Sequence, residues 1–120
     1  MSRDTDQDCM DACIECATAC NECVTACLHE NDVKMMARCI ALDIDCAALC
    51  QLAAAAIARD SELATVICEA CATACDACGE ECAKHDMDHC QRCAEACRAC
   101  AEACRHMVAK AGKPSAAAPR

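Results

Sequence analysis

The sequence contains no phenylalanine, tyrosine or tryptophan among its 120 residues. A core without aromatic rings has to be filled by alanine, cysteine, leucine, isoleucine, valine and methionine. Such small side chains allow helices to approach closely, or they leave space that something else fills. The length fits one domain and is too short for two. Cysteine, by contrast, occurs 19 times, so the chemistry of the chain is expected to be that of thiols.

Basic residues are scarce, with 11 lysines and arginines against 20 acidic residues and a net charge of −9. Binding to nucleic acid or to an anionic membrane surface requires cations that neutralise phosphate groups. We therefore expect neither partner. The acidic residues are interpreted as a solvated surface that keeps the protein soluble.

No apolar run approaches the length needed to span a membrane, and the stretch at residues 53–58 is far too short. Residues 1–8 are polar and acidic, without an apolar export-signal region or a twin arginine. We therefore expect a cytoplasmic protein without membrane contact. In that compartment thiols stay reduced.

The cysteines recur at alternating steps of three and four residues, which places their side chains along one face of a helix. Three such cysteine stripes are present, and short segments within them (CATAC, CATAC and CAEAC) align without gaps. The stripes consist of Cys9, Cys13, Cys16, Cys20, Cys23 and Cys27; of Cys68, Cys71, Cys75, Cys78 and Cys82; and of Cys90, Cys93, Cys97, Cys100 and Cys104.

The pattern predicts four helices, at about residues 5–30, 33–59, 62–84 and 88–111. Helices of this length joined by short connections form an antiparallel four-helix bundle. The expected fold is therefore all-α, with one domain over residues 1–112 and a cysteine-lined core. Residues 113–120, rich in alanine, proline and serine, are expected to be a disordered tail.

The second helix differs from the others, because it carries only Cys39, Cys46 and Cys50. Extending its stripe by threes and fours places Met35 and Asp43 where a thiol would otherwise stand. Asp43 either turns to the edge of the helix and is solvated, which we favour, or faces the core. In the core it would accept protons or orient a thiol during metal loading. This helix and the start of the third are expected to supply an aliphatic core that keeps the bundle folded without metal.

Nineteen thiols could form disulfides, fill the core as packing residues, hold iron–sulfur clusters or bind zinc. Disulfides within a helix are strained, because neighbouring stripe positions are roughly 5–6 Å apart at Cβ, whereas a disulfide needs about 3.8 Å. Disulfides between helices are possible, but they need an oxidising compartment, and the sequence shows no export signal. Cysteine as a simple packing residue does not explain three matched stripes. Iron–sulfur clusters need ligands folded around a cube, and many Zn²⁺ ions bound by thiolates would bury a large negative charge.

Cu(I) suits the pattern best, because it is a soft ion that prefers thiolate and thioether ligands. It accepts two or three sulfurs, and a thiolate can bridge two ions. A ratio of about one Cu(I) per thiolate also leaves the core neutral, which removes the cost of buried charge. All 19 cysteines are therefore candidate ligands.

One end of the bundle should collect the connections between the first and second helices and between the third and fourth. Histidine and methionine residues gather there, which suggests a copper entry site. Extension of the stripes points Met35, His85 and Met87 inward, as candidate ligands, and His29 outward. At the other end Met107 continues the fourth stripe.

This arrangement of C-x₂-C and C-x₃-C steps on four helices resembles the bacterial copper storage proteins, and in particular their cytosolic branch. The resemblance implies storage of many Cu(I) ions on the stripe cysteines, and a homotetramer. The alternatives are a copper chaperone that carries one ion, a Zn or Fe–S protein, or a thiol oxidoreductase. An oxidoreductase needs an exposed cysteine of low pKa, often at a helix N-terminus, whereas these stripes run mid-helix. We therefore expect a binding protein and not an enzyme.

Overall fold

The computed structural model describes residues 2–111 as four long helices and one short 3₁₀ helix. The elements are α1 (Ser2–Leu28), η1 (Val33–Met36), α2 (Ala37–Ala58), α3 (Ala64–Ala83) and α4 (Asp88–Ala111). The predicted all-α four-helix bundle is confirmed, and the helix bounds agree within a few residues. The predicted disordered tail at residues 113–120 lies outside the described residues.

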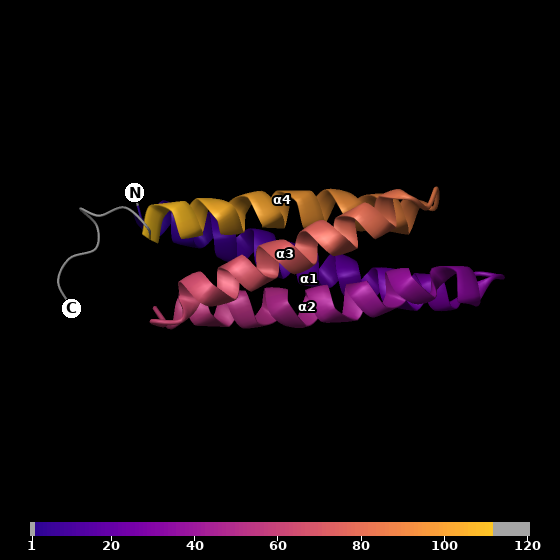
Figure 1. Ribbon diagram of the computed structural model, residues 1–120, viewed down its shortest axis with the longest axis horizontal. Coiled ribbons are helices and arrows are strands. Elements are labelled where there is room, and N and C mark those ends of the chain that lie inside the picture. The colour runs from indigo at the N-terminus through magenta and orange to yellow at the C-terminus, as the bar shows by residue number, and fades with distance from the viewer. Residues whose placement is uncertain (1, 112–120) are drawn as a thin grey trace.

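The helices run antiparallel in a square arrangement about 56 Å long and 20 Å wide (Figure 1). Helix α1 packs beside α2 and α4, and α3 packs beside the same two helices, so α1 and α3 lie diagonally opposite. The α1–η1–α2 and α3–α4 connections lie together at one end of the bundle. We call this the mouth end.

Cysteine and alanine make up nearly the whole interior. All nineteen cysteines are at most 1% exposed, and Ala17, Ala47, Ala72, Ala94 and Ala101 fill the space beside them. The predicted aliphatic core is only partly present. Ile57 is buried and Ile67 packs against the core, but Leu52, Leu63 and Val66 are 44%, 57% and 62% exposed.

Helix α2 and the turn before it form an apolar segment. Among the described residues, Val33–Ala58 is the one helical segment long and apolar enough to cross a membrane, although we expected no run of that length. A buried helix of a soluble bundle can have the same length and apolar composition. Asp43 and the three thiols of this segment are fully buried, and α2 packs along α1 and α3, as a core helix does.

The turn of η1 changes which methionine enters the core. Met36, the last residue of η1 and three residues before Cys39, is fully buried. Met35 turns outward and is 60% exposed. The prediction that Met35 points inward is therefore wrong, because it assumed a continuous α-helix from residue 33.

Gly79 allows α3 and α4 to approach closely. A Cβ added at this position would lie 3.2 Å from Cys97 Cβ and 3.7 Å from the carbonyl oxygen of Ala94. This close approach explains a glycine in the middle of a helix, where it costs about 1 kcal/mol relative to alanine.

We expect Gly79→Val to lower the free energy of unfolding of the metal-free protein by about 1–3 kcal/mol, because the larger side chain overpacks the α3–α4 contact. Thermal unfolding followed by circular dichroism measures the change. Ala70→Val, on the exposed face of the same helix, is the matched control for helix propensity. Equal losses in the two variants would show that the close approach is not limiting.

Candidate metal centre

The nineteen thiols form one continuous network in the core. None is in a disulfide, and sulfur atoms on different helices lie close together. Cys39 and Cys82 are 3.4 Å apart at Sγ, Cys46 and Cys75 3.6 Å, and Cys13 and Cys104 3.9 Å. The structure thus brings the predicted stripes face to face, as the spacing indicated.

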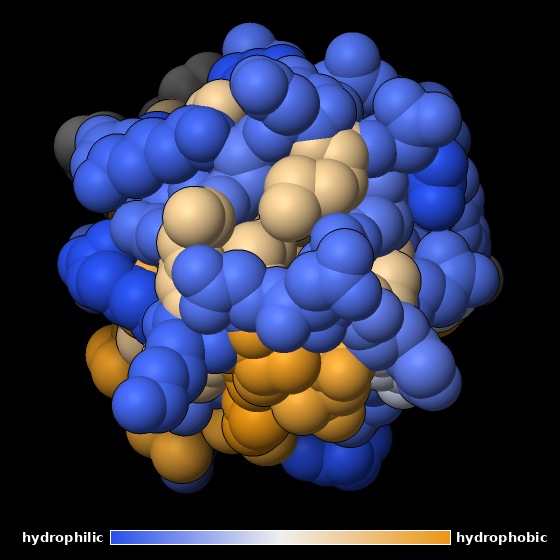
Figure 2. Space-filling view, turned by 90° about the vertical axis from the view of Figure 1, so that its right-hand side faces the viewer, coloured by the Kyte–Doolittle hydropathy of each residue, from blue (hydrophilic) through white to orange (hydrophobic). Residues whose placement is uncertain are grey.

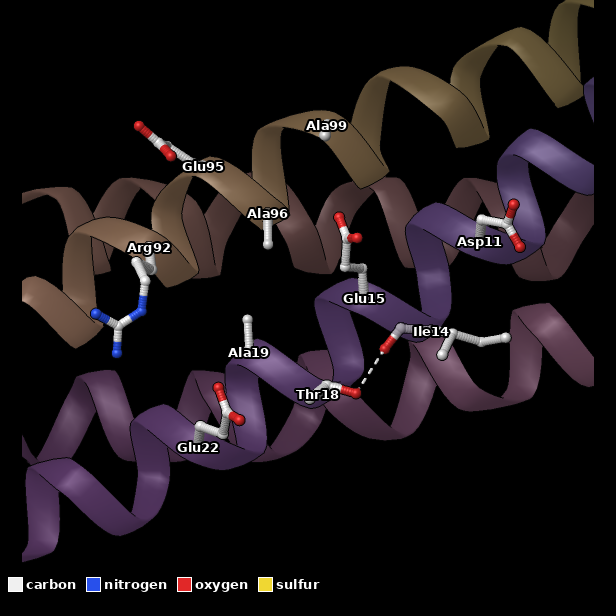
Figure 3. A pocket seen from close by; sticks show the side chains of 10 residues that line it. All are labelled: Asp11, Ile14, Glu15, Thr18, Ala19, Glu22, Arg92, Glu95, Ala96 and Ala99. Atoms are coloured by element: carbon white, nitrogen blue, oxygen red, sulfur yellow. Dashed lines mark hydrogen bonds between the residues drawn. The ribbon is translucent and has the colours of Figure 1, made fainter.

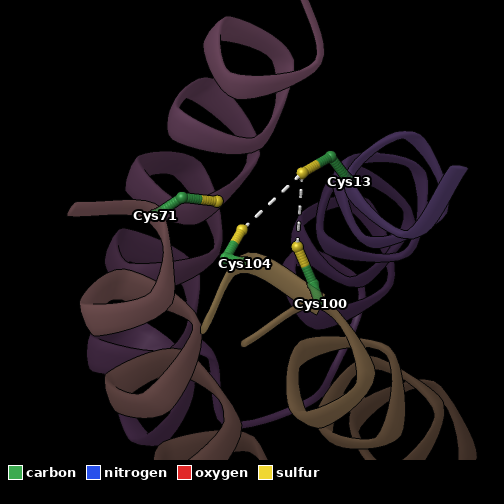
Figure 4. Close-up of side chains that lie close together, drawn as sticks. All are labelled: Cys13, Cys71, Cys100 and Cys104. Carbon is green, nitrogen blue, oxygen red and sulfur yellow. Dashed lines mark hydrogen bonds between the residues drawn. The ribbon is translucent and has the colours of Figure 1, made fainter. Parts of the chain in front are cut away.

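Several groups of four thiols could each surround a metal ion. Figure 4 shows Cys13 of α1, Cys71 of α3, and Cys100 and Cys104 of α4 pointing toward one another. In each group the four sulfur atoms lie within 4.8 Å of one another. Other such groups are Cys16, Cys46, Cys50 and Cys75; Cys16, Cys20, Cys46 and Cys97; Cys20, Cys78, Cys93 and Cys97; and Cys23, Cys27, Cys39 and Cys90. Because Cys16, Cys20, Cys46 and Cys97 each belong to more than one group, neighbouring ions would share ligands.

Five of these thiols lie nearest the mouth end, and we call them the mouth cysteines: Cys23, Cys27, Cys39, Cys82 and Cys90. Burial raises the pKa of Cys27 to about 11 and raises that of Cys90 as well. The empty protein therefore holds these two as neutral thiols at neutral pH. A metal ion that binds them has to displace their protons.

His89 is the imidazole that the structure brings to the thiols. Its Nδ1 lies 3.6 Å from Cys23 Sγ, 3.8 Å from Cys27 Sγ and 3.5 Å from Cys90 Sγ. Its Nε2 lies 3.0 Å from Glu30 Oε2, which orients the ring toward the sulfurs. The sequence reasoning did not select His89, because the residue lies beside the stripe at the position before Cys90. The signal that could have found it is its place in the first turn of α4, which brings it to the mouth.

His85, a predicted ligand, instead contacts a carboxylate. Its Nε2 lies 3.0 Å from Glu81 Oε2, and Arg38 and Lys84 contact Oε1 of the same group at 2.8 and 3.4 Å. Burial alone would raise the pKa of Glu81, but the hydrogen bonds from His85, Arg38 and Lys84 hold it below its usual value. Of the other predicted residues, Met87 packs half-buried against the core, and Met35 and His29 are exposed.

Asp43 faces the core and is completely buried, so the solvated position that we favoured is wrong. Three thiols surround its Oδ1, with distances of 3.0 Å to Cys78, 3.3 Å to Cys93 and 3.5 Å to Cys82. Cys39 lies 3.8 Å from Oδ2. The thiol hydrogen bonds satisfy the carboxyl group, which explains how an acidic side chain is accommodated there. Burial raises the pKa of Asp43 from 3.8 to about 8.

A surface groove lies between α1 and α4, on the outside of the bundle. It encloses about 760 Å³, and Figure 3 shows alanines on its floor and carboxylates at its edges. Its lining includes Ala19, Ala96, Glu15, Glu22 and Glu95 but no cysteine. The groove therefore lacks the soft ligands of the core.

The shifted pKa of Asp43 predicts a pH-dependent stability. The unfolded chain ionises Asp43 near pH 4 and the folded chain near pH 8. This residue therefore makes the free energy of unfolding of the metal-free protein fall as the pH rises between those values. Asp43→Asn should remove about 2–3 kcal/mol of the fall between about pH 5.5 and 7.5. Thermal melts at the two pH values measure it, with exposed Asp45→Asn as the control. An unchanged pH dependence in Asp43→Asn would contradict the buried, protonated carboxyl group.

Comparisons with known proteins agree with this geometry. The family model described as "Copper storage protein" matches residues 2–109. The cysteine-rich protein YhjQ of Bacillus subtilis is 52% identical over 80 residues, which cover 67% of this chain and 74% of that protein.

Two solved structures are similar over most of their length. The Cu(I)-bound copper storage protein BsCsp3, from Bacillus subtilis, has 50% identity and a TM-score of 0.83, covering 87% of this chain and 98% of that one. The Streptomyces lividans copper storage protein Ccsp, loaded with 10 copper equivalents, has 42% identity and a TM-score of 0.87, covering 89% and 86%. With its family model, its cysteine-lined bundle and these relatives in agreement, the chain belongs to the copper storage protein family.

Proposed function

We propose that this protein stores Cu(I) in the cytosol by binding many ions on the thiolates of its core. The observation that carries the proposal is the uninterrupted network of buried sulfur atoms, nineteen in number. Two supporting comparisons are BsCsp3, which is described as Cu(I)-bound, and a Streptomyces lividans relative, which is described as a cytosolic copper storage protein.

The charge of the core favours a high copper content. Deprotonating nineteen thiols without a counter-ion would bury a prohibitive negative charge. If each thiolate bridges two Cu(I) ions and each ion takes two thiolates, about one ion per cysteine makes the core neutral. Each ion that enters then releases about one proton.

Entry at the mouth end is supported by His89 and the mouth cysteines. A nitrogen ligand beside three thiols offers an incoming ion a mixed coordination site before it reaches the sulfur-only groups deeper in the core. Met35, His85 and Met87 remain predicted ligands. Met87 is placed to act at the rim, whereas binding by His85 would require it to leave Glu81 or to use its other ring nitrogen. Figure 2 looks onto this end and shows an apolar patch within a mostly hydrophilic surface. Leu28 at the end of α1 and Met35 in η1 are both more than half exposed.

The structure favours copper storage over a copper chaperone or an enzyme. A chaperone needs one accessible site, whereas this chain buries at least five groups of four potential thiol ligands, several of which share residues. Catalysis at the metal needs an open coordination position, which a Cu(I) ion bound only by buried sulfurs does not offer. We therefore propose a non-enzymatic role.

A homotetramer stays a prediction, supported by the outer surface of the bundle. Ile44 and Leu52 on α2 are 52% and 44% exposed, and Leu63 and Val66 at the start of α3 are more exposed still. Contact with further copies of the chain would bury these apolar side chains.

The stoichiometry of Cu(I) binding tests the proposal. An anaerobic titration of the reduced protein against a chromophoric Cu(I) chelator should reach about one ion per cysteine. Helicity measured by circular dichroism should change little, because the bundle positions its thiols before metal arrives. Saturation at one or two ions would overturn storage and favour a chaperone.

His89→Ala tests entry at the mouth. Loss of the imidazole should slow the uptake of the first ions, and weaken the site there, by roughly tenfold, with the total capacity little changed. Stopped-flow measurement of Cu(I) uptake from the chelator complex gives the rate. His29→Ala is the matched control, because His29 lies at the same end but is exposed, with Nδ1 2.9 Å from the carbonyl oxygen of Thr25. Identical rates in the two variants would place entry elsewhere.

A further inference from the structure

The thiols at the mouth end are covered in the folded protein. Each of the five mouth cysteines is 0% exposed, and Nδ1 of His89 faces inward, toward three of them. An ion at the surface of the protein therefore reaches neither a thiol nor this nitrogen. Some part of the mouth end has to move before copper can bind there.

Two short segments provide this cover. The turn of η1 buries Met36 completely, and Met36 packs with the thiols in the core. The connection between α3 and α4 contributes Met87, which packs half-buried against the same core, and His85, whose side chain is 10% exposed. Both segments lie at the ends of long helices, where local opening costs less free energy than in the packed middle of the bundle.

Glu81 joins these two segments to each other. Its Oε1 accepts a hydrogen bond of 2.8 Å from Arg38, which follows η1, and its Oε2 lies 3.0 Å from Nε2 of His85 in the connection. Lys84, three residues after Glu81, lies 3.4 Å from Oε1. On the other side of the connection, Gln91 of α4 donates a hydrogen bond of 2.6 Å to the carbonyl oxygen of His85. Glu81 thus ties the start of α2 to the connection that closes the mouth.

The burial of Glu81 makes this tie costly to break. Among the described residues, Asp43 and Glu81 are the two buried acidic side chains. Asp43 contacts thiols, whereas Glu81 contacts three nitrogen donors. An exposed ion pair contributes little, because water replaces the lost contact, but a buried carboxylate that loses a donor stays desolvated without compensation. The contact with Arg38 should therefore stay formed most of the time and open only briefly.

We propose that Glu81 is a positioning residue for copper entry, which holds the η1 turn and the α3–α4 connection together over the mouth cysteines. Separation of Glu81 from Arg38 lets the two segments part, and it opens a path to the thiols and to Nδ1 of His89. The proposal rests on the proposed storage function and on entry at the mouth end. It assigns to Glu81 the control of the rate of uptake, and not of the number of ions that are bound.

Arg38→Ala breaks the tie from its exposed side. The Arg38 side chain is 64% exposed, so its loss leaves the packing of the core intact, and Arg38 is not a candidate ligand. Stopped-flow uptake of the first Cu(I) ion from a chelator complex should be roughly tenfold faster than in the wild type, because a hydrogen bond to a charged group is lost. The total capacity should be unchanged.

Lys84→Ala is the matched control. It removes the same charge from the same carboxylate, and its side chain is 67% exposed, but Lys84 follows Glu81 on the same helix end and joins no separate elements. Its uptake should keep the wild-type rate. Equal rates in the wild type and both variants would overturn the proposal. Equal acceleration in both variants would overturn it as well, because the charge at the mouth alone would then explain the effect.

Amide hydrogen exchange in the metal-free protein tests the cover without copper. The amides of His85 and Gln91 donate to the carbonyl oxygens of Cys82 and Met87 at the two ends of the connection. Arg38→Ala should speed the exchange of these amides by roughly tenfold, with no change in the middle of α3, and Lys84→Ala should leave both unchanged. Faster exchange together with an unchanged rate of uptake would overturn the control of entry.

Two further variants show whether Arg38 acts through Glu81. Glu81→Gln should also accelerate uptake, and its combination with Arg38→Ala should add little, because both changes remove one interaction. Arg38→Lys keeps the charge and a donor, and it should restore part of the slow uptake. Fully additive accelerations would overturn the role of Glu81. A failure of storage itself would appear as saturation of the wild type at one or two ions, while the exchange measurement would still report on the contact.

Discussion

The burial of many thiols against one another is the constraint on which the rest of this structure depends. Sulfur atoms from four helices have to come within about 4 Å of each other, so the helices have to pack closely around short side chains. Aromatic residues would hold the helices apart, and the sequence has none. Alanine beside the cysteines and Gly79 at the α3–α4 contact serve the same close approach.

Regular spacing made most of this architecture predictable. Steps of three and four residues fix one face of a helix, and three matched stripes require one another as partners, so the bundle and its cysteine core follow from sequence alone. The predictions that were wrong or incomplete concern residues at the ends of the helices, where the regular spacing stops. Met35 was assigned to the core because the turn at Val33–Met36 cannot be distinguished by residue spacing from the start of an α-helix. His89 was placed at this end but was not selected as a ligand, because its contacts depend on how α4 begins against the end of α1.

Asp43 shows a different limit of sequence reasoning. On a helix with mostly apolar neighbours a carboxylate is usually solvated, and nothing in the pattern reveals four thiols on three helices that converge on it. The thiols donate hydrogen bonds to the oxygens of Asp43. Burial raises the pKa of its carboxyl group to about 8, which allows the group to stay protonated in the core. Asp43 thus places a polar group among the sulfur atoms, and it lowers the free energy of unfolding of the empty protein as the pH rises toward neutral. A cysteine at this position would not have this cost.

The departures from a uniform thiol lining share a location. His89, the turn before Cys39 and the charged cluster around Glu81 all lie at the mouth end. Asp43 separates Cys39, the one mouth cysteine on α2, from Cys46 and Cys50 deeper in the core. Soft Cu(I) binds sulfur more strongly than nitrogen or oxygen, so the sites available to an ion strengthen from the mouth inward. On the proposed entry route, an ion would therefore be drawn toward the centre, and the weaker ligands at the mouth would leave the entry region free for the next ion.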